Sequence, residues 1–311
     1  MKLGKLLSTP EAIVAAFLLL ATLWGTSFVA IEAGLGYFPP LLFAGVRFII
    51  AGAVVLGYAA VTADRWLPRG RDEWLGVVIV GTFVIAAYHG LLYLGEIRIS
   101  GAVAAVVVSL TPVLTAVFAA ALLPTERLGP VEIGGFALGV VGVTVVADPT
   151  GAGLDSAAVV GVALAFAATV AFSLGAVLLR PLRTGLPIAA LQGWAMVVGA
   201  GQLLVAAVAL GESPAAIVWN QTSIASLAYL TLLSGVVAFL LYFALLDAVG
   251  PSQLHLVGYA EPVVAAVGSW AILGHLVDAE ALIGFVAILA GFLALERREI
   301  VDYVGSDRLS G

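Results

Sequence analysis

The chain contains no cysteine, and its only lysines, Lys2 and Lys5, precede the first apolar stretch. The absence of cysteine excludes disulfides, thiolate metal sites and cysteine nucleophiles. Without a lysine elsewhere, the chain has no Walker A lysine to hold ATP phosphates and no buried lysine for a Schiff base. These absences exclude an ATP-driven pump built from this chain alone.

Charged residues are also scarce. They make up 10% of the 311 residues, whereas 62% are hydrophobic and the mean hydropathy is +1.16. Soluble domains carry about 25% charged residues, so the composition predicts an integral protein of the plasma membrane. The first apolar run, 12–31, is longer than the core of a signal peptide, and we expect it to be retained.

Apolar windows of the length that spans a bilayer, about 20 residues, occur ten times. They lie near 11–32, 40–62, 74–95, 100–122, 129–147, 157–179, 188–210, 223–246, 251–273 and 280–296. The fold class predicted is therefore an all-α integral membrane protein with ten transmembrane helices. Apart from Arg47 and Arg98, every lysine and arginine falls in a loop or end on the N-terminal side, which predicts that both termini are cytoplasmic.

The two halves of the chain repeat one another. Tyr93 and Tyr242 are 149 positions apart, and Pro112 and Pro262 are 150 positions apart. Each half holds five spans, an odd number, so the second half should enter the membrane inverted relative to the first, as in many secondary transporters. We expect repeats at 1–148 and 156–298, followed by a polar cytoplasmic tail at 299–311.

A carboxylate followed by proline, Glu261–Pro262, interrupts the ninth apolar window. A charge at that depth costs about 2.5–3.5 kcal/mol on insertion scales, so Glu261 should face protein or water. Pro262 has no N–H and should bend the helix against the carbonyl of Gly258. We interpret Pro112 and Pro262 as paired hinges, and Glu261 either as a contact for substrate or protons or as an acid held structurally at the bend.

Other polar or aromatic side chains fall inside the predicted spans. The candidate substrate-binding residues are Glu261, Arg47, Trp24, Tyr93, His89, Thr111, Ser173 and Tyr242. Helix geometry puts Arg47 at a depth similar to that of Glu261, so either a pair with Glu261 or binding of an anionic group is open. His89, Tyr93 and Glu96 share a helix face, which suits either a proton relay or structural hydrogen bonds. Trp24 either lines the pathway or packs against lipid.

These residues resemble a known family. Trp24-Gly25-Thr26-Ser27-Phe28, Arg47-Phe48, Thr111-Pro112 followed by Glu126, and Glu261-Pro262 together resemble the EamA family of the drug/metabolite transporter superfamily, from about residue 12 to 295. The resemblance implies a ten-helix basket with a central pathway lined mainly by helices 1–4 and 6–9. It also implies transport of small metabolites, often the export of amino acids. Gly274-His275 departs from the glycine-glutamate pair usual in the family, which puts any role of that second acid in doubt.

The function predicted is a secondary transporter that exports small metabolites by alternating access around a site near Glu261. An intramembrane enzyme and a passive channel are the alternatives, although the aspartates lie in loops or at span ends and no histidine pairs with a serine. We expect the bilayer and a small molecule as partners, and no cofactor, metal or nucleic acid. Proton coupling, exchange coupling and homo-oligomerisation stay open.

Overall fold

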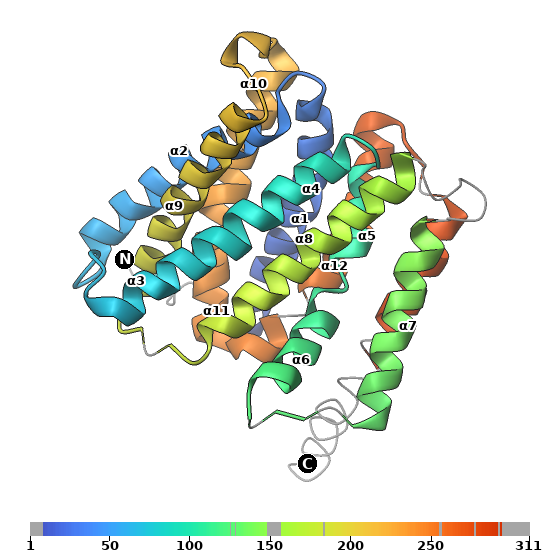
Figure 1. Ribbon diagram of the computed structural model, residues 1–311, viewed down its shortest axis with the longest axis horizontal. Coiled ribbons are helices and arrows are strands. Elements are labelled where there is room, and N and C mark those ends of the chain that lie inside the picture. The colour runs from blue at the N-terminus through green and yellow to red at the C-terminus, as the bar shows by residue number, and fades with distance from the viewer. Residues whose placement is uncertain are drawn as a thin grey trace.

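The computed structural model describes residues 9–124, 126–127, 129–147, 157–182, 184–254, 257–276, 278–291 and 293. Every regular element in these ranges is a helix (Figure 1). His255 and the predicted tail at 299–311 lie outside the described residues. The all-helical class predicted from the sequence is confirmed for the part of the chain that the structure describes.

In the described part of the first half there are eight helical segments. They are α1 (Pro10–Leu35), α2 (Pro40–Thr62), α3 (Gly70–Ile79), η2 (Val80–Ala87), α4 (Tyr88–Glu96), α5 (Gly101–Val108), α6 (Thr111–Leu122) and α7 (Pro130–Ala147). The segments α3, η2 and α4 are continuous and form one long helix over Gly70–Glu96.

The second half follows a similar plan. Its segments are α8 (Ala157–Leu179), α9 (Ile188–Ala209), η3 (Pro214–Ala216), α10 (Gln221–Ala228), η4 (Tyr229–Val237), α11 (Ala238–Leu254), α12 (Val257–Gly268), η5 (Ser269–Leu273) and a helix over Ala279–Gly291. Within α11, Gly250 has a φ of 78° and marks a kink between two helices. A positive φ is one that glycine adopts without steric cost.

Seven helices of the described chain are long and apolar enough to cross a membrane. They are Pro10–Leu35, Pro40–Thr62, Gly70–Glu96, Gly101–Leu122, Ala157–Leu179, Ile188–Ala209 and Gln221–Leu246. Three shorter apolar helices cover Ile133–Ala147, Val257–Leu273 and Ala279–Gly291. The structure is therefore consistent with a membrane protein of several apolar helices, while the count of ten spans stays a prediction.

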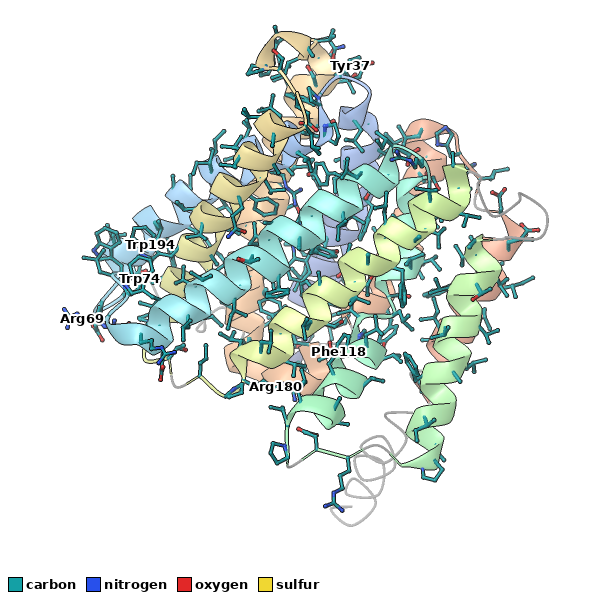
Figure 2. All side chains as sticks on the ribbon, in the orientation of Figure 1. Tyr37, Arg69, Trp74, Phe118, Arg180 and Trp194 are labelled. Carbon is teal, nitrogen blue, oxygen red and sulfur yellow. The ribbon has the colours of Figure 1, made fainter. Side chains whose placement is uncertain are left out.

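Polar contacts between loops define the two ends of the molecule. At one end, Arg65 donates two hydrogen bonds of 2.6 Å to the Glu73 carboxylate, and these bonds raise the pKa of the Arg65 guanidinium. Figure 2 shows Arg69, Arg180, Trp74 and Trp194 toward this end, which we call the arginine end, and Tyr37 at the opposite end.

The opposite end is closed by a carboxylate from the second half. Glu212 accepts hydrogen bonds from the amides of Leu41 (3.1 Å) and Leu42 (2.7 Å) at the start of α2. These amides have no partner within the helix, and a negative charge is favourable at a helix N-terminus. The amide of Val218 also donates to the carbonyl of Tyr37, so this loop joins the two halves.

Two stretches of π-helix interrupt the α-helical hydrogen bonding at related positions. They are η2 (Val80–Ala87) and η4 (Tyr229–Val237), whose first residues are 149 positions apart. That offset is the one between Tyr93 and Tyr242. π-Helical turns are rare and often lie at functional sites.

The helices that carry the two predicted hinges differ. In the first half, α5 ends at Val108 and α6 begins at Thr111, so the helix is divided immediately before Pro112. In the second half, α12 continues through Pro262 without interruption. The hinge role of both prolines stays a prediction.

Glycines bring α7 and the Ala279–Gly291 helix into backbone contact. A Cβ atom on Gly142 would lie 2.7 Å from the carbonyl oxygen of Gly284, and a Cβ on Gly284 would lie 2.6 Å from the carbonyl oxygen of Gly142. Gly291 contacts the carbonyl of Gly135 in the same way. Small residues at such contacts allow helices to approach closely in a membrane.

We expect Gly142→Ala to lower the thermal stability of the protein in detergent by several degrees. The added methyl group meets backbone atoms that cannot rotate away, and overpacking of this kind costs about 1–3 kcal/mol. Gly134→Ala is the matched control, because Gly134 lies on the same helix and a Cβ added there would meet no atom within 4 Å. Equal unfolding temperatures for the two variants would contradict the close contact.

Candidate functional site

Arg47 lies buried in the middle of α2, with 4% of its surface exposed. Its Cζ atom is 4.2 Å from the ring centre of Phe48 and 5.4 Å from that of Tyr93. Its Nε and Nη1 atoms are buried without a hydrogen-bond partner among the described residues. The guanidinium is therefore held by aromatic faces, through a cation–π interaction, and keeps donors free for a further group.

Glu96, at the end of α4, is an acid within electrostatic range of Arg47. It is 4% exposed, and neither carboxylate oxygen has a hydrogen-bond partner within the described chain. The charges of Arg47 and Glu96 interact, although their nitrogen and oxygen atoms are too far apart for an ion pair. The hydroxyl of Tyr93 beside them is also buried and unpartnered. Buried polar atoms are normally hydrogen-bonded, so three such groups together indicate a site for a small polar molecule or water.

His89 contacts two aromatic rings, those of Phe48 and Tyr88. Its ring centre is 4.3 Å from that of Phe48 and 4.5 Å from that of Tyr88. Its Nδ1 atom is 3.1 Å from the carbonyl oxygen of Ile85 in η2. A carbonyl only accepts, so Nδ1 carries the proton and Nε2 is left as the second polar atom of the ring.

Glu261 lies half-buried on α12, which Figure 1 places near the centre of the molecule. The absence of a side chain on Gly25 lets α12 approach α1, because a Cβ there would lie 2.8 Å from the carbonyl oxygen of Glu261. The Glu261 charge interacts with Tyr88, which links it to the group around Arg47. Between Arg47 and Glu261, both of which are described, there is no ion pair.

Trp24 faces protein. Its ring centre is 5.4 Å from those of Phe239 and Tyr242, and its indole N–H is 3.4 Å from the carbonyl oxygen of Ser234 in η4. Tyr242 contacts the Trp24 ring, whereas its counterpart Tyr93 contacts both Arg47 and the ring of Phe43. The structure brings Trp24 and Tyr242 together as an aromatic wall.

Thr111 and Ser173 also meet. The Ser173 hydroxyl donates to the carbonyl oxygen of Thr111 at 3.1 Å, and the Thr115 hydroxyl donates to the same oxygen at 2.8 Å. The Thr111 hydroxyl donates to the carbonyl of Val108 at 2.6 Å. These bonds satisfy carbonyls around the break between α5 and α6, so both predicted residues stabilise the divided helix.

The candidate residues therefore form three neighbouring groups and not one. They are Arg47 with Tyr93 and His89, Trp24 with Tyr242, and Thr111 with Ser173, and Glu261 lies within electrostatic reach of the first group through Tyr88. Tyr88 and Glu32 were not singled out from the sequence. Glu32 is the last residue of the first predicted span, 11–32, so its position gave a weaker signal than that of Glu261 inside its window.

Two hollows lie away from these groups. One, of about 330 Å³, lies between the long third helix and α9, where Gln202 donates to the Thr82 hydroxyl at 2.9 Å. The other, of about 290 Å³, lies between α7 and α8 and is lined mainly by apolar side chains. The unpartnered atoms of Arg47, Tyr93 and Glu96 line neither of them.

The long apolar helices, with charged side chains buried among them, indicate a polytopic membrane protein. The family model described as the EamA-like transporter family matches residues 12–147 and 159–296. The chain therefore belongs to the EamA-like transporter family, which confirms the family and class predicted from the motifs.

Relatives share sequence along most of the chain. The uncharacterized transporter YvbV of Bacillus subtilis is 26% identical over 281 residues, 90% of each chain. The uncharacterized inner membrane transporter YedA of Escherichia coli K12 is 28% identical over 255 residues, 81% of this chain and 80% of YedA. A solved crystal structure of 23% identity superposes with a TM-score of 0.64 over 93% of this chain and 99% of that one, which supports the fold.

Proposed function

We propose that the chain is a secondary transporter that exports small polar metabolites, such as amino acids, by alternating access. The observation that carries the proposal is the cluster of buried, unpartnered polar atoms on Arg47, Tyr93 and Glu96. Leaving a buried donor or acceptor unsatisfied costs about 1–3 kcal/mol, and more for a charged group. A protein that binds a polar substrate at this position recovers that cost when the substrate is present.

The chemistry of the surrounding residues suits a substrate with opposite charges at its two ends. The free donors of Arg47 match an anionic group, and a carboxylate at Glu261 matches a cationic one. Trp24 and Tyr242 supply an aromatic wall that binds apolar parts of a substrate without charge. These atoms are enclosed by packed helices, so substrate entry requires the helices to move.

An inverted repeat supplies the motion in this proposal. Supporting it are the two matches of the family model, one in each half, and the two π-helices at the same offset as Tyr93 and Tyr242. Helices of the two repeats then exchange roles as the site opens to one side and then to the other. The helices of Pro112 and Pro262 act as the moving walls.

The arginine end faces the cytoplasm in this proposal, because positively charged loops are retained there. Both termini lie on that side, and export runs from the arginine end toward the end closed by Glu212. Transport is driven by a proton gradient or by exchange with an external solute.

The test is counterflow in proteoliposomes that contain the purified protein. Vesicles loaded with one unlabelled metabolite of a panel of amino acids and related compounds are diluted into the labelled compound, with and without imposed proton and sodium gradients. We expect transient, saturable accumulation of at least one compound. Flux that rises linearly with concentration and shows no counterflow would indicate a channel, and chemical conversion of the compound would indicate an enzyme.

A further inference from the structure

One carboxylate joins three elements at the end opposite the arginines. Glu32, near the end of α1, accepts a hydrogen bond from the Gly101 amide through Oε2 at 2.8 Å. Its other oxygen, Oε1, is 2.8 Å from Nδ1 of His275, the second residue after η5. These contacts tie α1 to the start of α5 and to the end of the helix that carries Glu261.

Two of the three elements are fixed to each other independently of Glu32. A Cβ on Gly101 would lie 2.5 Å from the carbonyl oxygen of Phe28, so α5 packs directly on the backbone of α1. Ser100 caps the Val103 amide of α5, and Glu32 satisfies the Gly101 amide, which has no partner within that helix. The α1–α5 junction therefore stays closed whether or not His275 is bound.

The contact with His275 is the exposed part of this arrangement. The His275 side chain is 57% exposed, whereas that of Glu32 is 15% exposed. The backbone of His275 is held in a turn, because its amide donates to the carbonyl of Ser269 and Gly274 has a φ of 74°. The His275 side chain can thus break or form its contact with Glu32, and the end of the helix over Val257–Leu273 moves with it.

The contact joins two titratable side chains, and further charged groups lie on the neighbouring helices. Glu96 on α4 interacts with Glu32, and Arg47 on α2 interacts with Glu96. Arg98, in the loop after α4, donates a guanidinium N–H to the carbonyl oxygen of Leu94 in α4. Among the described residues, the carboxylate in contact with His275 is that of Glu32, and histidine is the side chain whose charge changes most readily near neutral pH.

We propose that Glu32 and His275 form a proton-dependent latch that holds the end opposite the arginines closed, and that loss of the proton from His275 releases the helix carrying Glu261. A protonated imidazole adds charge attraction to the hydrogen bond, whereas a neutral imidazole retains only the hydrogen bond. The latch is therefore stronger at acidic pH and weaker at alkaline pH. The latch rests on the proposed alternating-access transport, in which it closes the pathway at the end opposite the arginines.

The natural chain has no cysteine, so a single introduced thiol reports on opening without background. Ala104 is fully buried on α5, one turn below Gly101, and Ala104→Cys places the thiol under the latch. We expect His275→Gln in this background to speed labelling by a membrane-impermeant maleimide about two- to fivefold at pH 5.5, the range for a half-exposed ion pair. At pH 8 the two proteins should label at the same rate.

Three further measurements make the outcome decisive. Glu32→Gln should reproduce the effect of His275→Gln, whereas Glu126→Gln, which breaks the exposed ion pair with Arg180, should leave labelling unchanged. Amide hydrogen exchange at Gly101 and over 269–276, measured in the cysteine-free protein, detects the same opening without the introduced thiol. Equal rates for parent and His275→Gln at pH 5.5, or an equal ratio at both pH values, would overturn the latch. Labelling requires no substrate, so absence of counterflow would count against the transporter and not against the latch.

Discussion

Glutamine in place of Glu261 is expected to lower the rate of counterflow at limiting substrate at least about tenfold. The substitution keeps the size of the side chain and removes its charge, at a half-buried position of α12 within electrostatic reach of Tyr88. A hydrogen bond to a charged group contributes about 1.5–3 kcal/mol, and each 1.4 kcal/mol corresponds to a factor of ten in binding. The measurement is the initial rate of counterflow at saturating and limiting substrate.

The control for this variant is Glu126→Gln, which makes the same chemical change in an exposed ion pair. Glu126 and Arg180 are 49% and 45% exposed and 3.5 Å apart, so their interaction contributes little. We expect Glu126→Gln to transport at the wild-type rate. Wild-type transport by a folded Glu261→Gln protein would place the substrate site elsewhere, with the Arg47 cluster as the remaining centre.

The membrane class and the helical fold could be predicted from the sequence because both depend on apolar length. Burial of polar backbone in lipid requires internally bonded helices, and apolar runs of about 20 residues mark them. In these cases a local property of the chain determines the structural outcome.

The π-helices could not be predicted in this way. The stretches Val80–Ala87 and Tyr229–Val237 differ from α-helix in which carbonyl each amide bonds, and no residue type specifies that shift. That α12 continues unbroken through Pro262 also could not be predicted from the sequence. Proline removes one hydrogen bond, and the packing of α12 against α1 at Gly25 decides how the helix accommodates it.

Contacts between residues far apart in the chain also could not be predicted from the sequence. Depth along a helix placed Arg47 level with Glu261, but depth gives no information on which faces meet, and the structure sets Arg47 against Tyr93 and in range of Glu96. His275 and Glu32 are 243 positions apart in the chain. Their contact depends on how α1 and α12 pack, which periodicity in one sequence does not define.

The interaction between Arg47 and Glu96 should appear as non-additivity in a double-mutant cycle. Arg47→Met leaves the Glu96 charge buried among apolar groups, and Glu96→Gln leaves that of Arg47. Breaking a buried pair from one side is more damaging than removing both members, because the remaining charge has no compensation. We expect each single change to lower the unfolding temperature in detergent, and the double change to recover part of that loss.

The expected coupling energy between Arg47 and Glu96 is modest, because the two charges interact without touching. Interacting residues show coupling energies of about 0.5–3 kcal/mol, and Arg47 and Glu96 should lie in the lower half of that range because they share no hydrogen bond. A cycle that pairs Arg47→Met with Glu261→Gln serves as the comparison, since the structure shows no ion pair there. If the Arg47–Glu96 cycle were additive while the Arg47–Glu261 cycle showed coupling, Glu261 and not Glu96 would be the acid that balances Arg47, and the substrate would lie between them.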